Sequence, residues 1–135
     1  MRYLAIDLGH KRTGLAVGDD VLRIASPVAV IESADEATRV AAIERAIAEH
    51  GPGALVLGLP LNADGSEGPA AKAARAWAGQ LQQRTGLPVH LADERHSSDD
   101  ADAQMARTGL TRGQKKSRRD ALAAAVILQQ FLDAR

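Results

Sequence analysis

A continuous apolar run, Ala54–Leu59, constrains the fold more than any other segment of the chain. It has the length of a strand and no alternation of apolar and polar residues, which indicates a strand covered on both faces. Pro60 follows directly and ends it. Strands of this kind lie in parallel sheets between layers of helices, so the run predicts an α/β protein.

Other strands and helices are expected on both sides of this run. Residues 3–8 and 14–18 flank a short polar turn with glycine, which predicts an antiparallel hairpin. Further strands are expected at residues 27–31 and 87–92. The helices are predicted from their capping and stop signals: one from the capping box at Ser33 to Gly51, one from Pro69 to Gly86, a short one capped by Ser97 or Ser98 and broken by Gly109, and a last one from Ser117 to Asp133.

An antiparallel hairpin followed by alternating strands and helices predicts a mixed five-stranded sheet flanked by helices. This order is typical of the RNase H-like fold. The 135 residues suit one domain, residues 1–135. Cysteine is absent, which excludes disulfides and thiolate metal sites, and the apolar stretch at residues 121–128 is too short to span a bilayer. No signal peptide precedes the first strand, so we expect a cytoplasmic protein.

Carboxylates stand where two of the predicted strands end. Asp7 lies at the end of the first strand, and Asp93 and Glu94 follow the strand at residues 87–92. Ligands of open α/β sheets bind at these carboxyl ends. Asp120, expected in the first turn of the last helix, is a third acid that folding could bring to the same edge. Oxygen donors without a His or Cys pattern suit a hard cation such as Mg²⁺ or Mn²⁺.

Each acid also has a purely structural interpretation. Asp7 could accept hydrogen bonds from amides of the turn that follows it. Asp93 and Glu94 could form an ion pair with Arg95. Asp120 could close a capping box that begins at Ser117. The residues alone leave these alternatives open.

Basic residues are unevenly distributed although the formal net charge is zero. Residues 103–119 contain basic residues and no acidic ones, and a basic pair lies in the predicted hairpin turn. These side chains could contact phosphates or could form a solvated surface. The candidate phosphate contacts are Lys11, Arg12, Lys115, Lys116, Arg118 and Arg119. Because the chain has one Trp, one Tyr and one Phe, few aromatic side chains are available for stacking against bases.

Four segments together resemble the YqgF/RuvX family of candidate Holliday-junction resolvases, which is also implicated in maturation of pre-16S ribosomal RNA. They are AIDLGHKRTGLAVGD, GLPLNADGSEGP, DERHSS and KKSRRDALAAAVILQQFLD, in the family's order and spacing. The resemblance implies an RNase H-like nuclease that uses Mg²⁺ or Mn²⁺ to cleave structured RNA, pre-rRNA or branched DNA. By position, its catalytic and metal-binding acids fall on Asp7, Glu94 and Asp120. The chain departs from the family pattern at residues 96–98 and at Arg119, which are not acids of this set.

Two other functions compete with a nuclease. A non-catalytic nucleic-acid-binding or ribosome-assembly module could retain the fold without the chemistry. The pattern D-x-G followed by a hairpin also occurs at the start of ATP-dependent phosphotransferases. Those enzymes bind the nucleotide between two domains that begin in this way, and this chain has residues for one. We expect a monomer, with a two-fold dimer as the alternative that symmetric cleavage of a junction would require.

Overall fold

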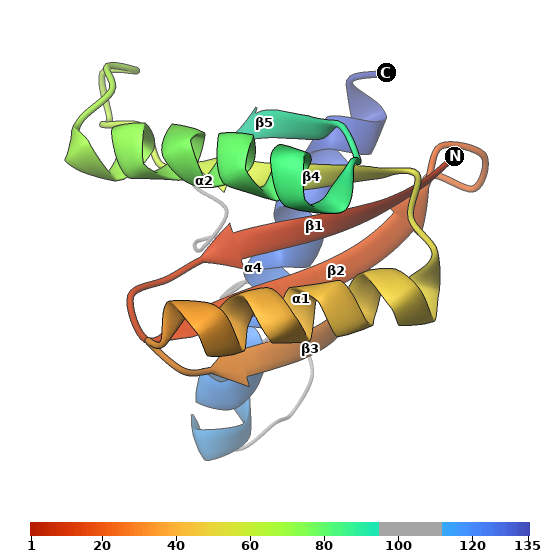
Figure 1. The fold of residues 1–135 in the computed structure, drawn as a ribbon, viewed down its shortest axis with the longest axis horizontal. Coiled ribbons are helices and arrows are strands. Elements are labelled where there is room, and N and C mark those ends of the chain that lie inside the picture. Colours follow the sequence, from red (N-terminus) through yellow and green to blue (C-terminus); the bar gives the residue numbers. More distant parts are fainter. Residues whose placement is uncertain (95–111) are drawn as a thin grey trace.

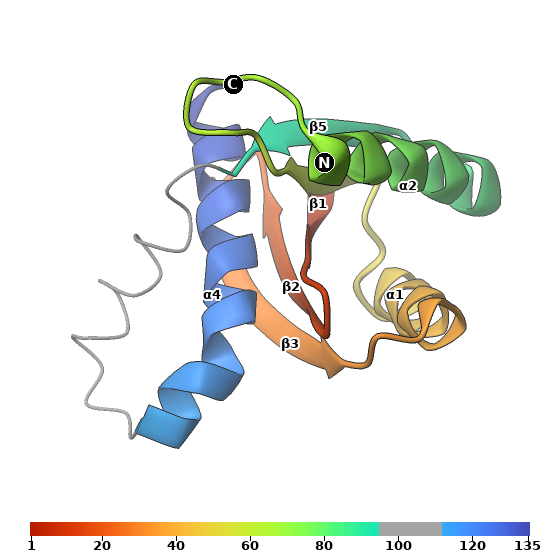
Figure 2. The same ribbon diagram turned by 90° about the vertical axis from the view of Figure 1, so that its left-hand side faces the viewer.

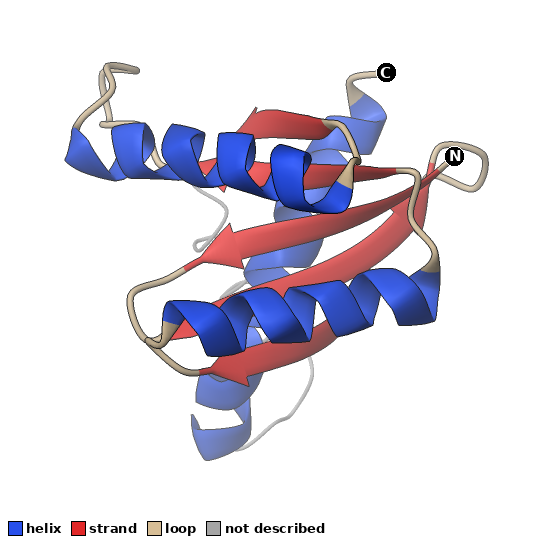
Figure 3. Cartoon of the chain, viewed as in Figure 1, coloured by secondary structure: helices blue, strands red, loops and turns tan. Residues whose placement is uncertain are grey.

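The computed structural model describes the backbone of residues 1–94 and 112–135, and side chains outside residues 95–120. A five-stranded mixed sheet forms its centre, as the sequence predicted (Figure 3). The strands are β1 (Arg2–Leu8), β2 (Arg12–Asp19), β3 (Ser26–Glu32), β4 (Ala54–Leu59) and β5 (Val89–Asp93), and their order across the sheet is β3-β2-β1-β4-β5. β1 pairs antiparallel with β2 and parallel with β4, which in turn pairs parallel with β5.

Helices cover both faces of this sheet (Figure 1). α1 (Glu36–His50) and α2 (Pro69–Thr85) lie on one face, and α4 (Arg112–Asp133) crosses the other, as Figure 2 shows. Within the described residues, no helix is long and apolar enough to cross a membrane. The sheet therefore separates a layer of two helices, α1 and α2, from a layer that contains α4.

The alternation of side chains along the strands divides the core in two. Leu4 and Ile6 of β1 belong to the cluster on the α1 and α2 side. Tyr3 and Ala5 belong to the cluster under α4. β4 is buried along its whole length, as its unbroken apolar sequence requires. By the same alternation, Asp7 lies on the α4 side of the sheet.

The predicted start of α1 was wrong by two residues. Asp35, rather than Ser33, is the N-cap, and its side chain accepts a hydrogen bond from Thr38 N at 2.9 Å. The Ser33 hydroxyl instead accepts a bond from Asp35 N, which fixes the chain just before the helix. The predicted end is confirmed, because Gly51 follows the helix in the left-handed conformation with φ at 62°.

The predicted start of the last helix was also wrong. α4 begins at Arg112, so Ser117 lies inside the helix and is not its N-cap. Lys, Arg and Gln around it favour helix, which explains the earlier start. Asp120 consequently lies beyond the first turn, and the capping-box interpretation of this residue fails. The short helix expected from Ser97 or Ser98 to Gly109 lies outside the described residues.

Thr13 of β2 generates a prediction about stability. Its side chain is completely buried, and its hydroxyl has no hydrogen-bond partner among the described residues. Because an unpaired buried hydroxyl is destabilising, Thr13→Val should raise the free energy of unfolding by about 1 kcal/mol. Urea denaturation measures this change.

Thr85 provides the matched control. Its hydroxyl donates to Leu81 O at 2.6 Å and accepts from Leu87 N at 3.2 Å. Thr85→Val should therefore lower the free energy of unfolding by about 1 kcal/mol. Equal losses of stability in both variants would contradict the assignment of Thr13.

Candidate functional site

The carboxyl ends of the three parallel strands meet at one edge of the sheet. Asp7 is the penultimate residue of β1, and Glu94 directly follows β5. Glu94 N donates to Leu59 O at 3.3 Å, which extends the pairing of β4 and β5 by one residue beyond Asp93. This backbone bond fixes the start of the segment that carries the Glu94 side chain.

Strand alternation explains why Glu94, and not Asp93, meets Asp7. Leu91 of β5 contacts the core on the α1 and α2 side, whereas Ala92 contacts the core under α4. Residue 93 therefore continues the first side and residue 94 the second, where Asp7 also lies. The sequence pair Asp93-Glu94 is thus divided between the two faces of the sheet.

The Asp7 and Glu94 carboxyl groups are in hydrogen-bond contact. The pKa of Glu94 is raised from 4.5 to about 8, chiefly by burial, with contributions from the charge of Asp7, the hydrogen bond with Asp7 and the charge of Asp93. Two carboxyl groups in contact repel each other when both are charged, which disfavours the charged form of Glu94.

A positive ion would compensate the same two carboxylates. Their oxygens are the donors that Mg²⁺ and Mn²⁺ prefer, so the chemistry of the pair fits such a cation. Among the side chains that the structure describes, no group of three His, Asp or Glu residues forms a metal cluster. The third predicted acid, Asp120, belongs to α4, but its side chain lies outside the described part of the chain.

The turn between β1 and β2 carries Lys11, leads into Arg12 at the start of β2, and is closed by its own backbone. Gly9 N donates to Arg12 O at 2.7 Å. A side chain at Gly9 would lie 2.5 Å from this carbonyl oxygen, so only glycine fits here. The Gly9 amide, one of the turn amides for which Asp7 was considered as the acceptor, thus has a backbone acceptor.

Arg39 of α1 joins this turn to the neighbouring loop, a role that the sequence did not reveal. Its guanidinium donates to His10 O and, at 2.7 Å, to Ser33 O. The turn is thereby tied to the start of α1. Lys11 and Arg12 are held at the same end of β1 and β2 as Asp7.

The remaining candidate phosphate contacts lie within α4 rather than in a loop before it. Lys115, Lys116, Arg118 and Arg119 all belong to the N-terminal half of this helix. Their side chains lie outside the described part. In a helix, residues three or four positions apart lie on the same face.

The loop after β4 is held by hydrogen bonds between its own residues. Asn62 N donates to Ser66 O, and Gly65 N donates to Asn62 O. Asp64 Oδ1 accepts bonds from both the backbone and the hydroxyl of Ser66. The loop follows the carboxyl end of β4 and so leaves the sheet at the edge where Asp7 and Glu94 meet.

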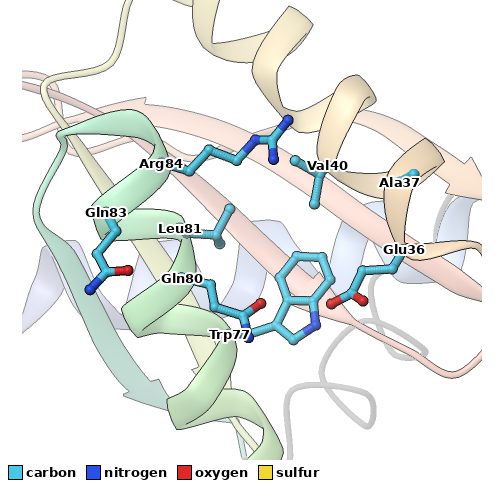
Figure 4. Close-up of a pocket in the computed structure, with 8 residues that line it drawn as sticks. All are labelled: Glu36, Ala37, Val40, Trp77, Gln80, Leu81, Gln83 and Arg84. Carbon is cyan, nitrogen blue, oxygen red and sulfur yellow. The ribbon is translucent and has the colours of Figure 1, made fainter.

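A pocket of about 630 Å³ lies between α1 and α2, as Figure 4 shows. Trp77 of α2 and Val40 of α1 point into it, and Glu36 and Arg84 lie at its margins. It is on the opposite side of the sheet from Asp7 and Glu94. The pocket is therefore separate from the acidic pair.

The raised pKa of Glu94 predicts a stability that depends on pH. Between pH 4.5 and about 8 the folded chain retains a proton that the unfolded chain has lost. The free energy of unfolding should therefore fall as the pH rises through this range, by about 2 kcal/mol, less than the full shift because the carboxyl is partly exposed. Denaturation in the presence of a chelator at pH 5, 6.5 and 8 measures the fall.

Substituting Glu94 should remove this dependence. Glu94→Gln should be more stable than the unchanged chain at pH 8 and should show a flatter profile, because the amide does not ionise. Glu49→Gln, at an exposed position of α1, is the control and should keep the original profile. An unchanged profile in Glu94→Gln would refute the assignment.

Known proteins resemble the chain over almost its whole length. A protein named "Putative pre-16S rRNA nuclease" from Anaeromyxobacter sp. strain Fw109-5 is 47% identical over 135 residues, which are 100% of this chain and 98% of the relative. A protein of the same name from Thiobacillus denitrificans is 46% identical over 98% of this chain and 91% of its own length.

Solved structures show the same fold at low sequence identity. Thermus thermophilus RuvC in complex with a Holliday junction substrate matches with a TM-score of 0.60 at 17% identity, over 100% of this chain and 96% of that chain. The fowlpox virus Holliday junction resolvase matches with a TM-score of 0.62 at 12% identity, over 100% of both chains. The predicted RNase H-like fold is confirmed.

The family assignment rests on the sequence itself. Residues 1–134 match the family model described as "RuvX: Holliday junction resolvase". This agrees with the resemblance carried by the four segments that begin at Ala5, Gly58, Asp93 and Lys115. The chain belongs to the RuvX family.

Proposed function

We propose that this chain is a divalent-metal-dependent nuclease that hydrolyses phosphodiester bonds in structured nucleic acid, with the 5′ end of pre-16S rRNA as its substrate. The contact between the Asp7 and Glu94 carboxyl groups at the sheet edge is the observation that carries this proposal. The names of the 46–47% identical relatives favour rRNA as the substrate. The description of the family favours a DNA junction as the second candidate.

Asp7, Glu94 and Asp120 are the residues proposed to hold Mg²⁺ or Mn²⁺. Position 120 precedes the buried residues Ala124 and Ile127 by one and two helical turns, and these residues contact the sheet under α4. This helical spacing supports the assignment of position 120 to the face of α4 that is turned to the sheet. One or two bound ions would lower the pKa of an attacking water and stabilise the leaving oxygen.

The residues of the chain supply position and charge for this reaction. Asp7 pairs with Gly14 of β2 and directly follows Ile6, which pairs with β4, and Glu94 is fixed by the bond of its amide to Leu59. Lys11 and Arg12, and the basic residues of α4, are proposed to hold phosphates of the substrate backbone. Such contacts orient a nucleic acid without reading its sequence, so selectivity would come from its shape.

Replacement of either acid should abolish cleavage without unfolding the protein. Asp7→Asn and Glu94→Gln keep the size of the side chain and remove its charge, so turnover should fall by more than about 100-fold. The measurement is Mn²⁺-dependent cleavage of a pre-16S rRNA 5′ fragment and of a four-way DNA junction, tested side by side. Glu44→Gln, on the α1 side of the sheet, is the matched control and should cleave normally.

The two substrates separate the candidate functions. Cleavage of RNA alone supports rRNA processing, and cleavage of the junction alone supports resolution. Binding of either substrate without cleavage by the unchanged chain would refute the nuclease and leave a binding module. Near-normal turnover in well-folded Asp7→Asn would refute the proposed site.

Binding should weaken with salt in proportion to the number of phosphate contacts. If Lys11 and Arg12 each contact one phosphate, replacing both by Ala should make the slope of log K against log salt concentration shallower by about 2. Fluorescence anisotropy between 50 and 200 mM salt, roughly the range over which such contacts dominate, measures the slope. Lys72→Ala on α2 is the control, and an unchanged slope in the double variant would contradict the role of the turn.

A further inference from the structure

Gly58 of β4 lies between the two acids of the proposed site. It pairs with Ala92 of β5, two residues before Glu94, and it follows Leu57, which pairs with Ile6 of β1, the residue before Asp7. Val56, two residues earlier on the same strand, belongs to the core under α4. Gly58 therefore faces the same side of the sheet as Asp7 and Glu94.

The place where a Gly58 side chain would lie is filled by the Glu94 carboxyl group. A Cβ atom at residue 58 would come closer than 3.0 Å to Glu94 Oε2 and to 3.2 Å from Glu94 Cδ. It would also lie 3.0 Å from Ile127 Cδ1. The nearest atoms thus belong to side chains and not to the backbone, and Glu94 is the one in closest contact.

The backbone at Gly58 does not itself require glycine. Its φ angle is outside the left-handed range that favours this residue. Glycine inside a strand is less favourable than residues with a side chain, because it loses more conformational freedom on folding and buries less apolar surface. The advantage of glycine at this buried position is the space that it leaves for Glu94.

We propose that Gly58 is a positioning residue, which leaves open the space in which the Glu94 carboxyl group lies against Asp7. The proposal rests on the proposed function, since the pair that Gly58 accommodates is the one assigned to metal binding. A methyl group at residue 58 displaces Glu94, whose side chain is partly exposed and can move outward. Ile127 is fully buried and has less freedom to yield.

The test compares Gly58→Ala with Gly79→Ala. Gly79 lies on the exposed side of α2, and a Cβ there would meet nothing within 4 Å. Calorimetry without nucleic acid gives the affinity for Mn²⁺, and cleavage assays give kcat/KM. Gly58→Ala should bind Mn²⁺ about tenfold or more weakly and cleave about 100-fold more slowly, while Gly79→Ala should match the unchanged chain in both.

A second pair of variants identifies the cause of any effect. Aspartate is shorter than glutamate by one methylene, so Glu94→Asp added to Gly58→Ala should restore part of the Mn²⁺ affinity. If Gly58→Ala lowers the melting temperature, the same substitution in a Glu94→Ala chain should lower it less, because the contact with the Glu94 carboxyl group is gone and only the one with Ile127 remains. An equal fall in melting temperature in both backgrounds would place the clash elsewhere and overturn the proposal.

The outcomes also separate this proposal from the one on which it rests. Unchanged Mn²⁺ affinity and cleavage in Gly58→Ala would overturn the role of Gly58 while leaving the nuclease intact. Absence of Mn²⁺ binding and of cleavage in the unchanged chain would refute the proposed function itself, and with it the role of Gly58.

Discussion

Parallel pairing of β4 with β1 on one side and β5 on the other determines the arrangement of the rest of the molecule. β4 is apolar and buried throughout, so helices must cover it from both faces. The pairing also aligns the carboxyl ends of three strands, which are distant in sequence, at a single edge. Asp7 and Glu94 meet there because the register of these strands brings them together. The contact between the Asp7 and Glu94 carboxyl groups is thus a consequence of how the apolar strands pair.

The sequence predicted most of the sheet because its strands carry local signals. The unbroken apolar run of β4 and the hairpin turn between β1 and β2 are visible without knowledge of the fold. Helix starts were harder, because Ser33 and Ser117 both occur in patterns that mimic an N-cap. At Ser33 a second capping residue two positions later forms the cap, and at Ser117 the preceding residues are themselves good helix formers.

The contact between Asp7 and Glu94 depends on the pairing of strands that are distant in sequence, and this pairing cannot be read from a single sequence. Asp93 and Glu94 are adjacent and chemically similar, and only the register of β5 against β4 shows which of them faces Asp7. The role of Arg39 was equally hidden, because its partners are backbone carbonyls without a sequence signature. A glycine inside an otherwise apolar strand was the one available signal for Gly58, since such glycines often mark a close approach.

The sheet also separates the only tryptophan of the chain from the proposed site. Trp77 lies half-buried in the pocket between α1 and α2, whereas Asp7 and Glu94 lie under α4. Indole emission depends on the immediate surroundings of the ring, which here include the pocket residues of α1 and α2 and the core cluster on that side of the sheet. The intrinsic fluorescence of the protein is therefore an optical signal for the integrity of the layer on the α1 and α2 side of the sheet, opposite the acidic pair.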